Sequence, residues 1–305
     1  MDPTFFLEQI FNGLGYGFML FLLAAGLTLV FGIMDTLNLA HGSLFMVGGY
    51  VSAAVHVQSG SFLLAVGVAV LATLVLAVLL EALLVRRLYS RDHLAQVLAT
   101  FGIVLIADDL VKLIWGPSPI MAPTPALLSG PVDLLGLPYP AYRLLILAAG
   151  LAVAVGLYLL VNHSRLGMLV RAGASNRAMA EFMGVRVSKV FAIVFALGAA
   201  LAALAGALMG PISAVAIGMG EAILIPALVV IVIGGIGSVR GAFVASLLVG
   251  LVDTAGRAFL PLLLRALLPP ALAADAGPAI ASIAMYLLMA GVLVFKPSGL
   301  FPARA

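Results

Sequence analysis

The chain has 305 residues, of which 64% are hydrophobic and only 9% are charged, and its mean hydropathy is +1.27. A soluble domain carries roughly 25% charged residues. The composition therefore excludes a water-soluble globular protein and predicts an all-α bundle of membrane-spanning helices. The formal charge is +3, and the absence of cysteine excludes disulfides and cysteine-based metal sites.

Apolar runs of about 20 residues mark the expected spans. In chain order they are 12–34, 37–57, 61–85, 94–115, 143–161, 190–212, 220–239, 241–264 and 277–295. The runs 220–239 and 241–264 are joined by almost nothing, so one of them could be re-entrant. The sequence thus predicts eight or nine spans.

The distribution of lysine and arginine orients the bundle. With the N-terminus outside and nine spans, most of the 15 basic residues fall in interior loops, which favours an N-out, C-in protein. Residues 116–142 are rich in proline and glycine, which predicts an external loop. Residues 162–189 are basic and too polar for lipid, which predicts a cytoplasmic loop. We interpret residues 1–305 as one transmembrane domain.

The cytoplasmic loop is expected to contain a short amphipathic helix. From a cap at Ser175 or Asn176, four apolar residues fall on one helical stripe: Ala178, Met179, Phe182 and Met183. Gly184 can end the helix. Because a helix of about two turns is not stable alone in water, it needs either a partner protein or the lipid headgroups, which Arg171 and Arg177 would bind.

The stretch "DTLNLAHGSLFM" places polar residues in an apolar segment. A polar side chain in lipid needs a partner, so Asn38, His41 and Ser43 either bond neighbouring helices or line a path for a polar ligand. A helix broken around Asp35–Asn38 would place such groups on the path. Asp253, deep in a later span, is a further candidate. No second histidine or carboxylate lies at ligand spacing from His41, so no metal site is expected.

Four stretches resemble the permeases of the branched-chain amino-acid ABC transporter family, in particular its LivH-like subunits. They are "GLTLVFGIMDTLNLAHGSLFMVGGYV", "RAGASNRAMAEFMGVRVSKVFAIVFALGAALAALAGALMG", "VIVIGGIGSVRGAFVASLLVGLVD" and "FKPSGLF", and they extend from residue 14 to 301. The second is similar to the coupling segment with which ABC importers dock on their ATPase. The expected coupling residues are Arg171, Ala172, Arg177, Ala180, Glu181, Gly184 and Val185.

This resemblance implies a permease subunit of an ABC importer, not an enzyme, in a bacterial inner membrane, and branched-chain amino acids as its substrates. It also implies a related second permease subunit, two ATP-binding cassette ATPases and an extracytoplasmic binding protein. The chain has no P-loop pattern, so ATP is expected on the partner subunits and no cofactor on this one. Permeases for urea and short amides share these patterns, so the substrate stays open.

Two other classes fit the residues less well. An ion-coupled transporter could use Asp35 or Asp253 as a titrating carboxylate, but it would not need the basic cytoplasmic helix, and inverted repeats are not evident. An intramembrane enzyme could use His41 and Ser43. However, positions i and i+2 of a helix face different sides, and neither G-x-S-x-G nor H-E-x-x-H occurs.

Overall fold

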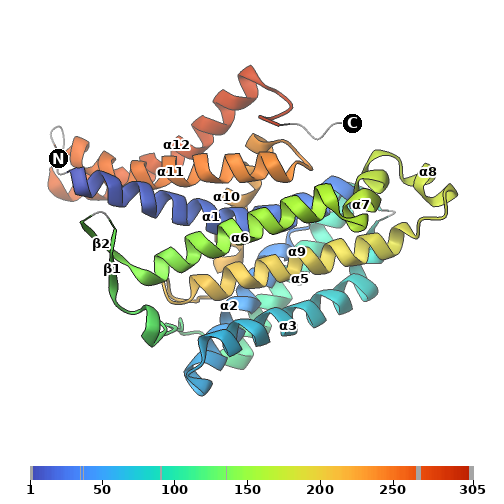
Figure 1. Cartoon of the computed structure of the whole chain (residues 1–305), viewed down its shortest axis with the longest axis horizontal. Helices are drawn as coiled ribbons and strands as arrows, with labels where there is room; N and C mark the ends of the chain where they lie inside the picture. The colour runs from blue at the N-terminus through green and yellow to red at the C-terminus, as the bar shows by residue number, and fades with distance from the viewer. Residues whose placement is uncertain are drawn as a thin grey trace.

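A computed structural model of the chain describes residues 3–34, 36, 38–89, 91–134, 136–265 and 269–301. Most of its long helices run along the longest axis of the molecule (Figure 1). The start of α1 and a β-hairpin lie at one end, and the short helices α7 (Arg165–Ser175) and α8 (Arg177–Phe182) lie at the other (Figure 1). We call these the hairpin end and the α8 end.

Each of the nine predicted apolar runs corresponds to one long helix. These helices are α1 (Pro3–Met34), α2 (Ala40–Ser59), α3 (Phe62–Leu80), α5 (His93–Trp115), α6 (Ala141–His163), α9 (Val187–Met209), α10 (Met219–Gly234), α11 (Val239–Leu264) and α12 (Pro270–Phe295). A π-helical turn, η1 (Glu81–Val85), continues α3 into α4 (Arg86–Leu88). Most helix ends lie within a few residues of the predicted bounds, but α1 begins nine residues before its run and α12 seven residues before its run.

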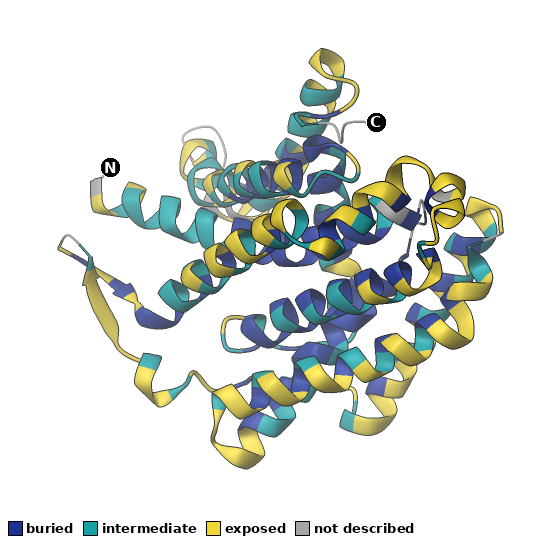
Figure 2. Cartoon of the chain, turned by 45° about the vertical axis from the view of Figure 1, so that its right-hand side comes forward, coloured by how far each residue is buried: buried dark blue, intermediate teal, exposed yellow. Residues whose placement is uncertain are grey.

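Six helices in the described part are long and apolar enough to cross a membrane. They confirm the prediction of a multi-pass, helical membrane protein. Of the other long helices, α10 has only 16 residues, α5 carries Asp108, Asp109 and Lys112, and α2 carries several polar residues. The outer helices expose apolar side chains, and buried residues concentrate at the centre of the bundle (Figure 2).

The centre of the bundle is held together by close backbone contacts around α2. A Cβ atom on Gly48 would lie 2.5 Å from the Cα of Ala203 in α9, and one on Gly206 would collide with the carbonyl of Phe45. Lipid supplies no hydrophobic force between helices, so small residues that permit such close packing are the usual means of association. Gly48 of α2 and Gly206 of α9 therefore allow these two helices to pack closely.

The predicted external loop contains no spanning helix. Its strands β1 (Pro131–Leu134) and β2 (Leu137–Pro140) form an antiparallel hairpin that follows a 3-10 turn, η2 (Ala126–Leu128). Ile120 and Val215 exchange backbone hydrogen bonds of 2.9 Å in both directions, which ties the loop to the connection between α9 and α10. The loop is thus ordered, and the hairpin is the one exception to the predicted all-α class among the described residues.

Two glycine-containing segments that lie far apart in the sequence, residues 233–240 and 299–301, contact each other. The amide of Leu300 donates to the carbonyl of Ile233 at 2.8 Å, and the amide of Phe301 donates to the carbonyl of Gly234 at 3.0 Å. The Arg240 guanidinium lies 4.9 Å from the centre of the Phe301 ring. We call this contact of residues 299–301 with the turn between α10 and α11 the C-terminal clasp.

Candidate coupling surface and translocation path

The cytoplasmic loop folds into two helices rather than one. The Ser164 hydroxyl accepts a hydrogen bond of 3.0 Å from the amide of Gly167 and begins α7, which the sequence analysis did not predict. The Asn176 side chain then accepts one of 2.9 Å from the amide of Met179 and begins α8. Gly184 has a φ of 85°, a left-handed conformation that glycine adopts without strain. The predicted short helix and its cap are therefore confirmed.

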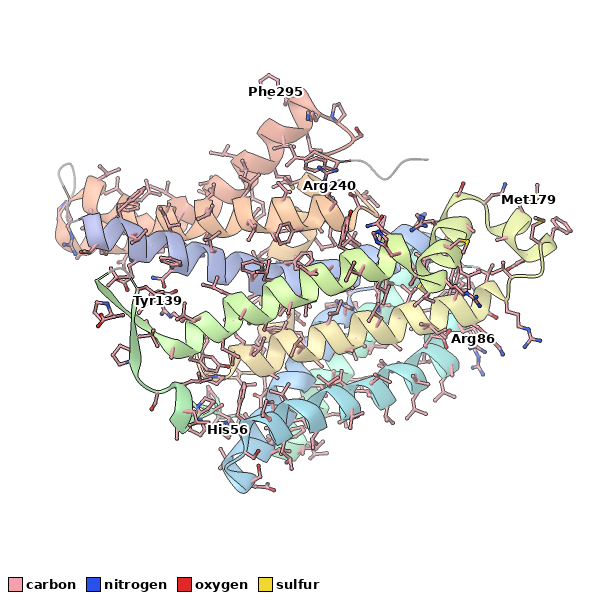
Figure 3. All side chains as sticks on the ribbon, in the orientation of Figure 1. His56, Arg86, Tyr139, Met179, Arg240 and Phe295 are labelled. Atoms are coloured by element: carbon pink, nitrogen blue, oxygen red, sulfur yellow. The ribbon has the colours of Figure 1, made fainter. Side chains whose placement is uncertain are left out.

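The apolar stripe of α8 faces away from the rest of the chain. Met179, Phe182 and Met183 are 58%, 88% and 80% exposed, and Met179 projects at the tip of the α8 end (Figure 3). In contrast, Ala180 is 5% exposed and belongs to the hydrophobic core, against which Val185 also packs. Thus α8 is anchored to the core on one side and presents an unpaired apolar surface on the other.

The remaining predicted coupling residues surround this surface. The Arg171 guanidinium donates to the carbonyl of Val161 and so ties α7 to the end of α6. Ala172 and Glu181 are exposed. The side chain of Arg177 lies outside the described part of the structure, so its contact with lipid or a partner stays a prediction.

The polar stretch at the start of α2 follows a break between helices. α1 ends at Met34 and α2 begins at Ala40, as predicted, although Asp35 itself lies outside the described residues. His41 reaches Gly26 of α1, where an added Cβ would lie 3.0 Å from its Nε2. Because Gly26 precedes the end of α1 by eight residues, α2 begins beside α1 at a point about 12 Å back from the end of that helix. Non-helical backbone at such depth requires burial within protein.

The structure buries three predicted path residues at or near this break. Asn38, His41 and Ser43 are 3%, 1% and 5% exposed. The Asn38 Oδ1 accepts a hydrogen bond of 3.1 Å from the amide of Ala40. However, the Asn38 Nδ2, the His41 Nε2 and the Ser43 Oγ have no hydrogen-bond partner among the described residues. Each unpaired group costs roughly 1–3 kcal/mol, so these atoms are suited to bind a water molecule or a polar ligand.

Asp253, the fourth described path candidate, lies apart from this group. It is 6% exposed on α11, and its carboxylate accepts a hydrogen bond of 2.8 Å from the Nε of Arg257. Arg257 also donates to the Ser282 hydroxyl on α12 at 3.2 Å. The carboxylate is thus held in an ion pair that joins α11 to α12.

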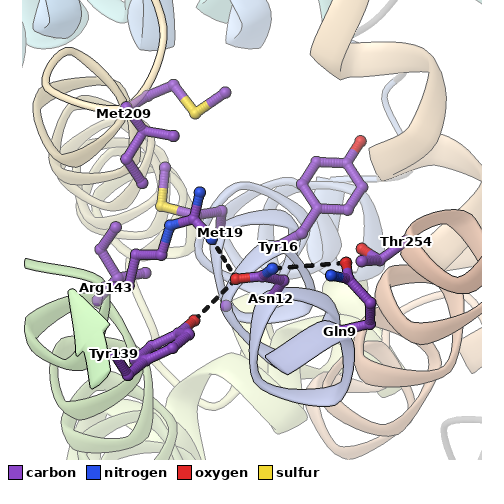
Figure 4. A pocket seen from close by; sticks show the side chains of 11 residues that line it. Gln9, Asn12, Tyr16, Met19, Tyr139, Arg143, Met209 and Thr254 are labelled. Atoms are coloured by element: carbon purple, nitrogen blue, oxygen red, sulfur yellow. Dashed lines mark hydrogen bonds between the residues drawn. The ribbon is translucent and has the colours of Figure 1, made fainter. Parts of the chain in front are cut away.

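A cavity at the hairpin end was not predicted from the sequence. It has a volume of about 210 Å³ and is lined by Gln9, Asn12, Gly15, Tyr16, Met19, Tyr139, Arg143, Ile146, Met209, Ile212 and Thr254 (Figure 4). The Asn12 Oδ1 accepts hydrogen bonds from the Tyr139 hydroxyl at 3.0 Å and from the Arg143 guanidinium. Burial raises the pKa of Tyr139, so its hydroxyl stays a neutral donor.

Comparison with known proteins defines the family of the chain. A family model described as branched-chain amino acid transport system, permease component, matches residues 9–295. The chain belongs to this family. It is 30% identical over 264 residues to the high-affinity branched-chain amino acid transport system permease protein BraD of Pseudomonas aeruginosa, which covers 82% of this chain and 86% of that protein.

Two further relatives of this permease carry the name LivH. The high-affinity branched-chain amino acid transport system permease protein of Escherichia coli K12 is 28% identical over 271 residues, which is 84% of this chain and 87% of that protein. A probable branched-chain amino acid transport permease of Methanocaldococcus jannaschii is 26% identical over 253 residues, or 78% and 77% of the two chains. No solved structure matches the permease significantly.

The permease thus carries three chemically distinct features along its length. Exposed apolar residues of α8 lie at one end, unpaired polar atoms of α2 lie inside, and a cavity with polar and apolar walls lies at the hairpin end. The cavity is formed by α1, β2, α6, α9 and α11. Its only sequence signal was Arg143, a basic residue next to a long loop.

Proposed function

We propose that this permease is a subunit of an ABC importer in a bacterial inner membrane and carries branched-chain amino acids into the cell. It forms a single permease domain of nine membrane-embedded helices with the hairpin end outside and the α8 end in the cytoplasm. Basic residues at the α8 end, among them Arg86, Arg91 and Arg165, support this orientation. ATP is hydrolysed by two separate ATPase subunits, and a related second permease subunit completes the path.

The exposed apolar stripe of α8 is the observation that carries this proposal. Met179 and Phe182 on this six-residue helix and Met183 directly after it are 58%, 88% and 80% exposed. Apolar side chains exposed in this way are unfavourable in water. The helix is therefore suited to insert its apolar face into a groove of a partner. Because Ala180 joins the core, a partner that moves α8 would also move the helices behind it.

The path proposal connects the outer cavity with the start of α2. An aliphatic amino acid has an apolar side chain and two charged groups, and the cavity offers matching apolar and polar walls. The N-terminus of α2 carries a partial positive charge, and the unpaired atoms of Asn38, His41 and Ser43 lie beside it. A substrate carboxylate would bind there briefly once the helices part, as at the broken helices of other transporters.

Energy coupling separates this proposal from an ion-coupled transporter. The Asp253 carboxylate, a candidate for proton or sodium coupling, is bound to Arg257. Uptake of leucine into cells should therefore persist when an uncoupler removes the proton gradient and stop when ATP is depleted. Loss of uptake with the uncoupler at constant ATP would contradict the ABC assignment.

The docking role of α8 can be tested with one charged substitution. Phe182→Asp places a carboxylate on the exposed stripe, and loss of an interface hot spot weakens binding by about 2 kcal/mol or more, roughly thirtyfold. The ATPase subunits should no longer co-purify with the variant, although it should insert and elute like wild type. Leu127→Asp, at a residue 98% exposed near the hairpin end, is the matched control. Retention of the ATPase by Phe182→Asp would refute the docking role.

A further inference from the structure

A second cavity lies at the α8 end of the permease, where α4 meets the first half of α5. Its volume is about 270 Å³, and it is lined by Leu84, Arg87, Leu88, Arg91, Ala99 and Ile103. Arg86, the neighbour of this lining, lies at the same end of the molecule as Met179 (Figure 3). The cavity therefore has two guanidinium groups at its edge and an aliphatic wall behind them, and neither proposal above uses it.

The two arginines of this cavity have no carboxylate partner in the part of the chain that the structure describes. The nearby buried acid, Glu81, is already satisfied, because it pairs with Arg86 at 3.2 Å and accepts a hydrogen bond from the Tyr89 hydroxyl at 3.1 Å. Asp92 is exposed and forms no ion pair with a described residue. Arg87 and Arg91 thus keep their full positive charge available.

The position of the cavity along the helix fits the headgroup layer of a membrane. The apolar span Phe62–Leu88 has 27 residues, which corresponds to about 40 Å of helix against a hydrocarbon core of about 30 Å. Arg87, one residue before the end of the span, therefore reaches the polar headgroups. Below it, Leu83 and Leu84 are 58% and 45% exposed, so the wall continues toward the depth of acyl chains.

We propose that this cavity binds the headgroup of an anionic phospholipid. The lipid phosphate accepts hydrogen bonds from Arg87 and Arg91, as guanidinium groups favour phosphate oxygens. The upper part of an acyl chain packs on Leu84, Leu88 and Ile103. Basic cavities between spans on the cytoplasmic side are suited to anionic lipids. The proposal requires only that the α8 end lies at a membrane surface, whatever the substrate is.

Native mass spectrometry of the purified full-length permease tests this inference. The permease is equilibrated with equal amounts of phosphatidylglycerol and phosphatidylcholine of the same acyl chains, and the retained lipids are counted. One phosphatidylglycerol should remain bound preferentially. Each surface arginine contributes about 1 kcal/mol to binding of an anionic lipid, so Arg87→Gln with Arg91→Gln should weaken retention roughly thirtyfold.

Two controls separate a defined site from general attraction to basic residues. Arg165→Gln with Arg186→Gln removes the same charge from exposed positions outside the cavity and should leave retention unchanged. Ala99→Phe keeps both arginines but fills the cavity, and it should also lose the lipid. Added inorganic phosphate should not compete at concentrations near that of the lipid, because it lacks the acyl chain.

Several outcomes would overturn the lipid site. Equal retention of both lipids by the wild-type permease would do so without any variant. Equal losses in the two arginine pairs would show only diffuse attraction. Competition by phosphate alone would identify a free anion site, and binding of an ATPase subunit that depends on Arg87 and Arg91 would identify a protein contact. None of these results would by itself contradict the ABC assignment.

Discussion

The start of α2 and the helix α8 differ in opposite ways from the usual pattern, in which apolar residues are buried and polar residues are exposed. At the start of α2, polar side chains such as His41, which is 1% exposed, lie inside the bundle. On α8, apolar side chains such as Phe182, which is 88% exposed, lie outside it. The first group is enclosed by neighbouring helices of the same chain, whereas the second has no described residue over it. Buried polar atoms without a partner thus indicate a small ligand inside the protein, whereas exposed apolar side chains indicate a large partner outside it.

The largest expected effect breaks the packing around α2. Gly206→Leu would drive its side chain into the backbone of α2 at Phe45, and because backbone cannot move aside as a side chain can, the cost exceeds the roughly 1–3 kcal/mol of ordinary overpacking. We expect little folded protein in detergent, measured as the monodisperse peak in size-exclusion chromatography. Gly67→Leu, on α3 with no atom near the added Cβ, should elute like wild type. Similar peaks for both variants would contradict the tight contact of α2 with α9.

The next effect separates the two faces of α8. Ala180 is 5% exposed, so Ala180→Asp buries an unpaired carboxylate at a cost of several kcal/mol. We expect residues 176–185 to exchange amide hydrogens rapidly and the ATPase to be lost. Ala178→Asp, two residues away at an exposed position, should keep the exchange pattern of wild type. Protection of Ala180→Asp at the wild-type level would show that α8 is not anchored to the core.

Two asparagines give a smaller, matched comparison. Asn38 and Asn176 each accept a hydrogen bond from the amide in the first turn of a helix, at 3.1 and 2.9 Å. Replacement by alanine removes about 1 kcal/mol in each case. Asn38→Ala should lower the melting temperature of the whole permease by about 2 °C, whereas Asn176→Ala should only increase local exchange in α8. An equal shift of melting temperature in both would remove the distinction between the regions.

The smallest expected effect concerns an unpaired hydroxyl. The Ser43 Oγ has no hydrogen-bond partner among the described residues, so Ser43→Ala should leave stability unchanged or raise it by up to about 1 kcal/mol. If the hydroxyl meets the substrate, leucine uptake falls about fivefold at the same time. A lower melting temperature with normal uptake would instead assign Ser43 to helix packing.

Local patterns in the sequence predicted much of the fold. Apolar runs gave the positions of the long helices, and the residues Asn176 and Gly184 gave the two ends of α8, because caps depend on neighbouring residues. The break near Asn38 was also predicted from polar residues in an apolar run. α7 was not predicted, because its two arginines and two glycines are typical of a polar loop, although Leu166, Leu169 and Val170 recur at helical spacing.

Features that depend on distant contacts could not be predicted. Glu81 lies near the end of an apolar run, where an acid is usually hydrated, yet it is 2% exposed because Arg86 and Tyr89 bind it. The cavity at the hairpin end joins Asn12 to Tyr139, residues more than a hundred positions apart. To predict such sites one must know which helices pack against one another, and hydrophobic periodicity alone does not give this information.

The C-terminal clasp affects when the permease can finish folding during synthesis. The carbonyls of Ile233 and Gly234 receive the amides of Leu300 and Phe301, so their partners leave the ribosome more than sixty residues later. Until then, the carbonyls of Ile233 and Gly234 lack these two hydrogen-bond donors. Synthesis of Leu300 and Phe301 therefore completes the hydrogen bonds of this turn, and a chain that stops before residue 300 would lack both of them.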